Sequence, residues 1–445
     1  AVDDDPTKLN QTIHGVPVKG TLEDIPDLCK RYGIHSIIIA IPTLKGSKLN
    51  HVIDLCVSTH CAVQLLSDPQ LVGSGTPQQG AFRELNPADF LSRDEVTLDT
   101  DQISGYLTGK TVLVTGGGGS IGSELCRQVM RFKPGKLLIF DIYENCAYEL
   151  LMELQQKYGR DIPVTVLIGS IRDKKRLDEV FETYHPTVVF HAAAHKHVPL
   201  MEVSPAEAVK NNVLGTKNLL VSASEHDVER FVQLSTDKAV NPTSVMGCTK
   251  RICEMLIQTF AGNTDMKCVA VRFGNVLGSH GSVIPLFEAQ IKKGGPVTLT
   301  DPNIERYFMT IPEAAQLVLQ AGALAESGNI YVLDMGEPVK IMDLAKQLIR
   351  FYGYEPGVNM EIKIVGLRPG EKLYEELMMD EEQGKMRRTE HNKIFVASPR
   401  DIDLAVFYQQ LQDLAAAAQH NDEGVVQQLA KMIPTFTPTR QNLKL

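Results

Sequence analysis

A glycine-rich turn between a buried strand and a helix constrains this chain more than any other feature. Residues 111–115 (TVLVT) predict a buried strand, a run of glycines follows, and a helix is predicted over 120–132. In this setting Gly116 would permit the tight turn, Gly119 would let the backbone approach a pyrophosphate, and Gly122 would let helix and strand pack closely. The pattern indicates a dinucleotide-binding unit, and the alternative is a turn that is merely flexible.

The chain downstream repeats the alternation of strand and helix. Buried strands are predicted at residues 137–141, 164–168, 187–190, 230–234 and 269–273, with helical stretches between them. Repeated βα units predict an α/β fold with a doubly wound parallel sheet. From about residue 280 the rhythm loosens, as expected of a smaller substrate-binding lobe.

A smaller α/β unit is predicted upstream of the glycine-rich turn. Helical spacing over 22–32 and 48–59 alternates with strands predicted at 35–41 and 62–66, which implies a parallel sheet. The expected domains are a truncated Rossmann-like unit at 1–85, a connecting segment at 86–108, a dinucleotide-binding domain at 109–380 and a mostly helical segment at 381–445.

Composition excludes several classes of protein. With 43% hydrophobic and 22% charged residues, the chain can bury a core, and a formal net charge of −9 disfavours non-specific nucleic-acid binding. The eight cysteines form no CxxC pair and no cluster with histidine at zinc spacing, so no metal site is expected. The sequence also lacks an apolar run of 18 residues, so no transmembrane helix is expected in this chain.

Candidate cofactor-binding residues follow the predicted strands. Asp141 ends the second strand, 19 positions after Gly122, where a carboxylate would bind a ribose 2′-hydroxyl and favour NAD over NADP. Asp141 and Asp173 could equally cap the helices that follow them. The candidate cofactor-binding residues are Thr115, Gly116, Gly119, Ser120, Ile121, Gly122, Asp141, Ser170, Ile171, Asp173, Ala192, Ala193, Ala194 and Lys250.

The stretch HAAAHKH at 191–197 suggests a metal site at first sight, because His191 and His195 are four residues apart. No HExxH glutamate accompanies them, and the segment leaves a strand rather than lying within a helix, so a metal site is rejected. Small alanines at a strand end instead suit the close approach of a cofactor. Each histidine taken singly could be structural.

Candidate catalytic residues follow the fifth strand. Thr236, Asp237 and Lys238 would lie beyond its carboxyl end, where ligands bind in doubly wound sheets. An adjacent acid and base can divide general acid and general base duties, provided that burial lowers the pKa of the lysine. Met246 and Lys250 come shortly after, on one helical face. An ordinary surface ion pair is the alternative for Asp237 and Lys238.

These motifs carry a resemblance to a known family. Residues 110 to about 380 resemble the nucleotide-sugar 4,6-dehydratases of the extended short-chain dehydrogenase/reductase superfamily, in particular the large, membrane-anchored UDP-N-acetylglucosamine 4,6-dehydratases of polysaccharide and glycoprotein-sugar pathways. The first 70 or so residues resemble the cytoplasmic N-terminal domain of that family without its opening glycine-rich turn. The resemblance rests on residues 115–122, 191–199 (HAAAHKHVP), 235–250, 272–276 (RFGNV), 281–285 (GSVIP), 301–309 and 366–376 (GLRPGEKLYEE).

The resemblance implies a redox-neutral lyase that uses tightly bound NAD. Hydride would leave C4 of the hexose, Lys238 would remove the C5 proton, Asp237 would protonate the departing C6 hydroxyl, and the hydride would return to C6. The alternatives are a nucleotide-sugar 4-epimerase or dehydrogenase on the same fold, which normally keeps a tyrosine and lacks the Asp–Lys pair, and a non-catalytic NAD-binding regulatory module.

The chain departs from the superfamily pattern at Met246, where a tyrosine normally stands. A thioether cannot take a proton, so the base for the C4 hydroxyl is unassigned. The resemblance implies that Met246 marks a subfamily that retains the C5 configuration, and that Lys250 holds the nicotinamide ribose. The large dehydratases therefore remain the expected family.

Substrate-binding residues are also implied by the resemblance. Arg306 and Arg368 would bind the diphosphate, Glu371 the nucleoside, and Asn275 would lie near the sugar and diphosphate; Arg306 and Glu371 could instead form ordinary ion pairs. The full expected set is His197, Asn275, Pro285, Thr298, Arg306, Arg368 and Glu371. The implied partners are a UDP-sugar and further copies of the chain, with no nucleic acid. The implied location is the cytoplasmic face of the inner or plasma membrane, with an anchor upstream of this chain.

Overall fold

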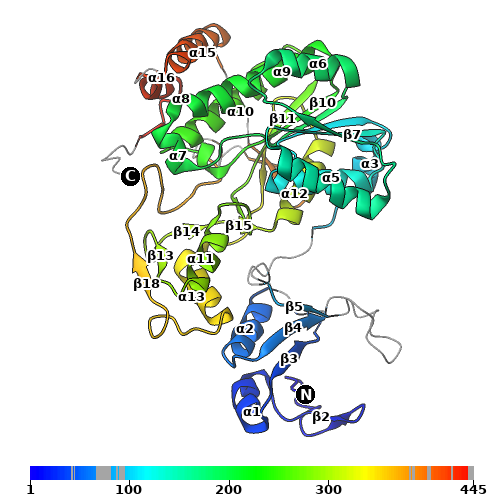
Figure 1. Cartoon of the computed structure of the whole chain (residues 1–445), viewed down its shortest axis with the longest axis vertical. Coiled ribbons are helices and arrows are strands. Elements are labelled where there is room, and N and C mark those ends of the chain that lie inside the picture. Colours follow the sequence, from blue (N-terminus) through cyan, green and yellow to red (C-terminus); the bar gives the residue numbers. More distant parts are fainter. Residues whose placement is uncertain are drawn as a thin grey trace. The chain divides into compact units, whose positions relative to one another are not determined.

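The chain forms two compact units in the computed structural model (Figure 1). Unit 1 comprises Ala1–Glu95, Gly281–Ile304 and Val339–Gly366, and unit 2 comprises Val96–His280, Glu305–Pro338 and Leu367–Leu445. The structure describes residues 1–41, 44, 46–66, 82–86, 89, 96–379, 382, 386–397, 402–421 and 424–438.

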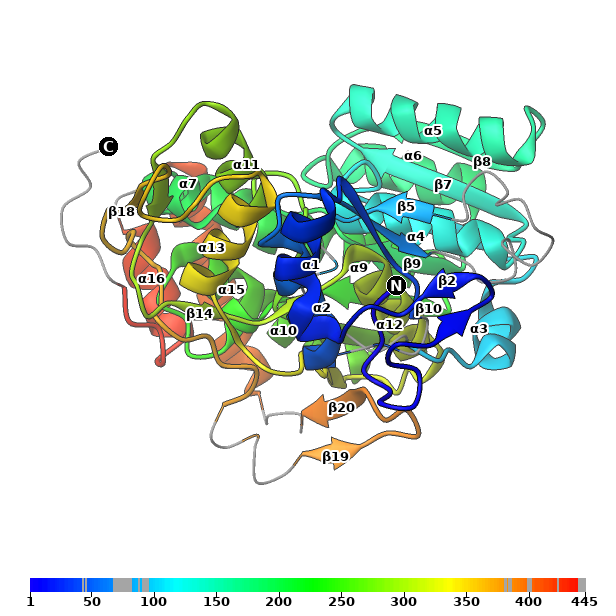
Figure 2. The ribbon, with the colours of Figure 1, turned by 90° about the horizontal axis from the view of Figure 1, so that it is seen from below.

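Unit 2 is built on one large sheet. Among its described residues nine strands are hydrogen-bonded in the order β19-β20-β16-β11-β10-β9-β6-β7-β8. The strands from β16 to β8 are parallel, and β20 and β19 add an antiparallel edge (Figure 2). Their bounds are β6 Thr111–Thr115, β7 Lys136–Asp141, β8 Val164–Ile168, β9 Val188–His191, β10 Arg230–Leu234, β11 Lys267–Arg272, β16 Ile330–Leu333, β19 Arg387–Arg388 and β20 Ile394–Ala397.

The strand order reverses between β6 and β9, which defines the switch point where doubly wound sheets bind ligands. Helices cover both faces of the sheet (Figure 1). The α/β fold with a doubly wound sheet is therefore confirmed. The covering helices are α3 Thr100–Leu107, α4 Ser120–Arg131, α5 Glu144–Tyr158, α12 Ile311–Ala323 on one face and α6 Lys174–Tyr184, α9 Gly215–Glu225 and α10 Val245–Ala261 on the other.

Alternating side chains of the strands supply two hydrophobic cores, one on each face. In β6, Leu113 joins the core under α6, α9 and α10, whereas Val112 and Val114 join the core under α3, α4, α5 and α12. Successive side chains of a strand point to opposite faces, so a run of β-branched and leucine residues is what a strand covered on both faces requires. All three side chains are fully buried.

Three features of the chain differ from the expected organisation. Residues 100–107, expected within a connecting segment, form α3, whose Tyr106 hydroxyl donates to the carbonyl of Leu319 at 2.8 Å. The rest of that segment lies partly outside the described residues. The expected helical C-terminal segment also supplies β19 and β20 before α15 Leu404–Gln419 and α16 Val425–Met432. Residues 281–304 and 339–366 belong to unit 1 rather than to the dinucleotide-binding unit.

Unit 1 contains a small sheet, β3-β4-β5, in which β3 and β4 are parallel as predicted. In its later part β13 pairs with β18 in parallel. Its elements are β1 Thr12–Ile13, β2 Val16–Pro17, η1 Leu22–Asp24, α1 Ile25–Tyr32, β3 Ser36–Ile39, α2 Gly46–Val57, β4 Ala62–Leu66, β5 Phe82–Glu84, α11 Val283–Lys292, β13 Val297–Leu299, β17 Val339–Lys340, α13 Ile341–Phe351 and β18 Ile362–Ile364.

Unit 2 also contains several short elements outside its large sheet. They are α7 Val198–Val203, α8 Pro205–Ala208, the π-helical turn η4 Val209–Leu214, the 3-10 turn η5 Asp237–Ala239, β12 Asn275–Val276, β14 Glu305–Arg306 and β15 Phe308–Met309. Within the described ranges, no helix has both the length and the apolar character needed to cross a membrane.

Candidate active site

The glycine-rich turn connects β6 to α4 at the switch point of the sheet. Gly116 has a φ of 67°, in the left-handed region, and a Cβ there would lie 2.6 Å from the backbone nitrogen of Ala193. A Cβ on Gly122 would overlap the carbonyl oxygen of Gly116. Gly116 therefore requires glycine because of its positive φ and its contact with the backbone of Ala193. Gly122 requires glycine because α4 contacts the turn at this position. The shape fits a dinucleotide at the N-terminus of α4.

Asp141 links the glycine-rich turn to the end of β7. Its Oδ2 accepts the backbone N–H of Gly118 at 2.8 Å, and its Oδ1 accepts that of Tyr143 at 2.9 Å. Asp173 is the N-cap of α6 and accepts the N–H of Arg176 at 3.0 Å. The carboxylates of both candidate residues thus organise the local backbone, and their roles toward a cofactor stay predictions.

The other cofactor candidates lie around the same strand ends. Ser120 shares a hydrogen bond of 3.2 Å with Nδ1 of His280. Ser170 accepts the N–H of Arg172 at 3.2 Å. Ile171 is buried, and a Cβ on Gly215 would lie 2.7 Å from it. The residues that follow β9, 192–194, approach the glycine-rich turn through Ala193, whose backbone faces Gly116.

His191 is a structural residue. Its ring is fully buried and hydrogen-bonds the hydroxyl of Thr115 at 2.7 Å and that of Thr216 at 2.9 Å. Burial, helped by the charge of Lys250, lowers the pKa of His191 to about 3, so the ring is neutral. Over the described part of the chain, no group of three or more histidine, cysteine or acidic side chains could hold a metal ion.

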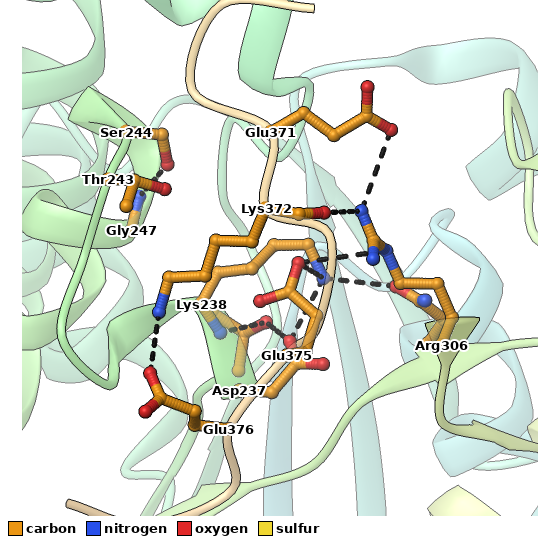
Figure 3. Close-up of polar contacts among 12 residues, drawn as sticks. Asp237, Lys238, Thr243, Ser244, Gly247, Arg306, Glu371, Lys372, Glu375 and Glu376 are labelled. Atoms are coloured by element: carbon orange, nitrogen blue, oxygen red, sulfur yellow. Dashed lines mark hydrogen bonds and ion pairs between the residues drawn. The ribbon is translucent and has the colours of Figure 1, made fainter. Parts of the chain in front are cut away.

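The end of β10 brings the predicted catalytic residues together. Asp237 is fully buried, and its Oδ1 accepts the Thr236 hydroxyl at 2.8 Å and Nζ of Lys238 at 3.0 Å. Nζ of Lys238 also donates to Oδ1 of Asn275 at 3.1 Å. These four residues form one cluster, of which Figure 3 shows Asp237 and Lys238. Oδ2 of Asp237 is buried with no hydrogen-bond partner among the described residues, and a Cβ on Gly274 would lie 3.2 Å from it.

The pKa of Lys238 differs from the sequence-based expectation, in which burial lowers this pKa so that the lysine can act as a base. Burial acts to lower the pKa of Lys238, but the negative charges of Asp237 and Glu375 outweigh it, so the pKa is raised. The condition that burial lowers this pKa is therefore not met. Lys238 is an ammonium in this state and can become a base only by passing its proton on.

The start of α10 carries the remaining catalytic candidates. The Ser244 hydroxyl accepts the N–H of Gly247 at 3.1 Å and caps the helix. Met246 is 4% exposed and packs in the core, where it has no proton to offer. Lys250 is 6% exposed, and burial lowers its pKa. Its charge contributes to the lowered pKa of His191, the last residue of β9.

The guanidinium of Arg306 is buried and makes its contacts within the protein. Its guanidinium donates to the carbonyls of Lys372 at 2.7 Å and Leu373 at 3.0 Å, and it pairs with Glu371 at 3.5 Å and Glu375 at 3.7 Å (Figure 3). Two of these contacts are ion pairs of the kind that the sequence left open as an alternative, and a role of Arg306 toward a diphosphate stays a prediction. The hydrogen bonds and ion pairs of Arg306 hold residues 371–375 next to β14.

The other substrate candidates are spread over both units. The N–H of Arg368 donates to Oε2 of Glu371 at 3.0 Å, so these two residues form one turn in unit 2. His197 is the exposed N-cap of α7. Pro285 lies in α11 of unit 1. Thr298, also in unit 1, accepts the side-chain amide of Gln290 at 2.7 Å.

Two groups of residues were not predicted from the sequence. Glu375, 8% exposed, pairs with Lys238 at 3.6 Å although it lies 137 positions downstream. Behind Ser235 lies a buried ion-pair network of Arg272, Glu254, Arg251 and Glu382. An arginine that ends an apolar strand, KCVAVR at 267–272, was a usable sign of the network, because such a charge needs a buried partner.

Comparisons with known proteins identify a family for this chain. The model of a family described as "Polysaccharide biosynthesis protein" matches residues 112–399. The "Capsular polysaccharide biosynthesis protein CapD" of Staphylococcus aureus is 53% identical over 85% of this chain and 63% of its own length. The chain thus spans less than two thirds of that relative.

More distant relatives are described by an activity. The "UDP-N-acetylglucosamine 4,6-dehydratase (inverting)" of Campylobacter jejuni is 34% identical over 60% of this chain and 76% of its own length. The "UDP-glucose 4-epimerase" of Rickettsia canadensis is 34% identical over 67% of this chain and 86% of its own length. Among solved structures, Pen from Bacillus thuringiensis is 35% identical with a TM-score of 0.61, covering 66% of this chain and 89% of its own.

Proposed function

We propose, from the premise that this chain belongs to the polysaccharide biosynthesis protein family, that it is a nucleotide-sugar 4,6-dehydratase. Its substrate is UDP-N-acetylglucosamine, and its product is the UDP-linked 2-acetamido-2,6-dideoxy-xylo-hexos-4-ulose. The observation that carries the proposal is the contact between Lys238 and Asp237, a base and an acid 3.0 Å apart at the carboxyl end of β10. Elimination of water needs a base that removes a proton from the substrate and an acid that protonates the departing hydroxyl of the same molecule.

One proton transfer prepares both members of this pair. In the resting state Lys238 is an ammonium and Asp237 a carboxylate, since the pKa of the lysine is raised. Passing one proton from Nζ to Oδ1 makes the lysine a base and the aspartate an acid at once. The hydroxyl of Thr236 and the amide oxygen of Asn275 hold the two groups in place during the transfer.

The elimination then balances within the pair. Lys238 takes the C5 proton, the C–H electrons form the C5–C6 double bond, and the C6–O electrons leave with the oxygen. Asp237 gives its proton to that oxygen, so water departs and the pair is again an ammonium and a carboxylate. Lys238 later returns a proton to C5, and the proton released from the C4 hydroxyl restores the pair.

The cofactor is NAD, which solved structures of the same fold also hold. It supplies the redox chemistry by accepting hydride from C4 and returning it at C6. The glycine-rich turn and the N-terminus of α4 would hold its pyrophosphate, and Lys250 its nicotinamide ribose. Lys250 is buried on α10, and its charge contributes to the lowered pKa of His191, the last residue of β9.

A 4-epimerase is the second candidate, because one relative carries that description at 34% identity. An epimerase needs a single proton carrier at the C4 hydroxyl and has no use for an acid and a base at C5 and C6. The buried Asp237 beside Lys238, together with a thioether at Met246, favours dehydration. A purely regulatory NAD module would likewise have no use for the pair.

Deuterium transfer tests the proposal. Substrate deuterated at C4 is incubated with the protein, and the products are followed by NMR and mass spectrometry. We expect loss of water and deuterium at C6. Net reduction of the nicotinamide, deuterium lost to solvent, or UDP-N-acetylgalactosamine as the only product would each reject dehydration. UDP-glucose and dTDP-glucose, run in parallel, test the sugar and base preference.

A further inference from the structure

Glu375 supplies a second carboxylate to the lysine of the proposed acid–base pair. Its Oε1 lies 3.6 Å from Nζ of Lys238 and 3.7 Å from Nε of Arg306 (Figure 3). Asp237 approaches the same ammonium at 3.0 Å, and Glu375 is 8% exposed. The ammonium of Lys238 therefore contacts two carboxylates, and only one of them has a role in the elimination described above.

Several contacts anchor the backbone of residues 370–373, which leads directly to Glu375. The hydroxyl of Thr243 donates to the carbonyl of Gly370 at 3.0 Å, and a Cβ on Gly370 would lie 2.8 Å from Cβ of Ser244. Nζ of Lys372 donates to the carbonyl of Val240 at 3.0 Å. With the bonds from Arg306 to the carbonyls of residues 372 and 373, these contacts fix this stretch of backbone. The course of residues 370–373 therefore does not depend on the contact between Glu375 and Lys238.

The charges around Glu375 come from three elements of unit 2. They are Asp237 and Lys238 after β10, Arg306 on β14, and Lys372 on its own segment. Its Oε2 is buried without a hydrogen-bond partner in the described part of the chain. Burial and the charge of Asp237 raise the pKa of Glu375, against the three cations. The carboxylate in turn helps to raise the pKa of Lys238.

We propose that Glu375 is a positioning residue for the elimination: its carboxylate holds the Lys238 ammonium against Asp237 and keeps a proton on that pair under alkaline conditions. This inference rests on the proposed function, because the pair must carry one proton to supply both a base and an acid. Without Glu375 the pair would lose that proton at a lower pH, and no acid would remain for the C6 hydroxyl.

Competitive labelling of lysines tests the electrostatic part without any substrate. Full-length protein is treated with trace acetic anhydride over a pH series, and acetylation of Lys238 is measured by mass spectrometry. In Glu375→Gln we expect the midpoint of Lys238 reactivity to fall by about one to three pH units, the usual effect of one close opposite charge. Glu376→Gln is the matched control, because Glu376 is 46% exposed and pairs with Lys372. An unchanged midpoint in Glu375→Gln overturns the proposal.

The pH profile of dehydration tests the role in turnover. We expect the alkaline limb of kcat to move down by the same interval in Glu375→Gln, and to return most of the way in Glu375→Asp, which keeps the charge. A lower rate with an unmoved limb would indicate a merely structural role and overturns the proposal. Melting temperatures separate these effects from misfolding. If the wild-type protein dehydrates no UDP-sugar, the proposed function fails, and the labelling result still decides whether Glu375 holds the charge on Lys238.

Discussion

Arg272 and Glu254 form a bidentate ion pair that is fully buried. Nε of Arg272 lies 3.0 Å from Oε1 of Glu254, and Nη2 lies 2.9 Å from Oε2, joining the end of β11 to α10. The same Oε1 accepts the hydroxyl of Ser235 at 2.7 Å, one residue before Thr236. The pair therefore fixes the end of β10, from which the proposed acid and base extend.

Breaking this pair should destabilise the protein strongly. Burial acts to raise the pKa of Glu254, but Arg272 and Arg251 outweigh it and lower the pKa to about 2. Glu254→Gln leaves both guanidinium groups buried with one countercharge fewer, so we expect a loss of about 3–5 kcal/mol in the free energy of unfolding. Urea denaturation measures it. Glu153→Gln, which breaks the exposed pair with Arg127, should cost below about 1 kcal/mol.

Acid sensitivity should depend on His191. Its pKa is about 3 when folded and near the ordinary value of 6.5 when unfolded, so the folded state binds fewer protons between these values. The contribution of the neutral His191 ring to the free energy of unfolding is fully present above pH 6.5. As the pH decreases from 6.5 to about 3, this contribution is lost at up to about 1.4 kcal/mol per pH unit. Urea midpoints at several pH values should show a shallower decline in His191→Gln. His185→Asn removes a histidine in the left-handed C-cap of α6 and should keep the wild-type slope.

The sheet could be predicted from the sequence because its strands and turn follow local rules. The glycine-rich turn has a left-handed Gly116 as its pattern required, and the five strands predicted after it lie within two residues of the observed ones. The antiparallel edge, β20 and β19, was missed, because strands of two and four residues give almost no periodic signal.

Local sequence patterns predicted the candidate site only where its residues are close in sequence, and Asn275, which Lys238 also contacts, was expected from the resemblance alone. Thr236, Asp237 and Lys238 are consecutive, and their contact follows from the end of one strand. Glu375 reaches Lys238 through the tertiary course of a distant segment, which no local pattern specifies. The raised pKa of Lys238 follows from Asp237 together with that second carboxylate, and the contribution of Glu375 could not be predicted from the sequence.

Turnover should depend on the Asp–Lys pair and not on the thioether. Lys238→Ala and Asp237→Asn should each lower kcat for dehydration by roughly a hundredfold or more, the usual scale for one acid–base group. Met246→Leu conserves volume and should keep substantial activity, because Met246 is 4% exposed and packs in the core. Initial rates of water loss measure all three. A fall in Met246→Leu as large as that in Lys238→Ala would contradict these roles.

The configuration at C5 should be retained, although a relative at 34% identity is described as inverting. Inversion needs a proton donor on the face opposite to the base that removed the C5 proton. Met246 occupies the position where the superfamily has a tyrosine, and a thioether donates no proton. Lys238, held between Asp237 and Glu375, then returns a proton to the face from which it took one. NMR coupling constants of the first product should therefore show the xylo sugar.

The same reasoning predicts the effect of adding a donor. We expect the phenol of Met246→Tyr to supply the missing proton donor, so the share of the C5-inverted arabino sugar should rise above that of the wild type. Met246→Phe supplies the same ring without the hydroxyl and separates crowding from proton donation, because the buried site must accommodate either ring. An arabino sugar as the first product of the wild-type protein would show that some group other than a residue at position 246 protonates C5. Equal shares from the Tyr and Phe variants would show that the ring, not its proton, decides the configuration.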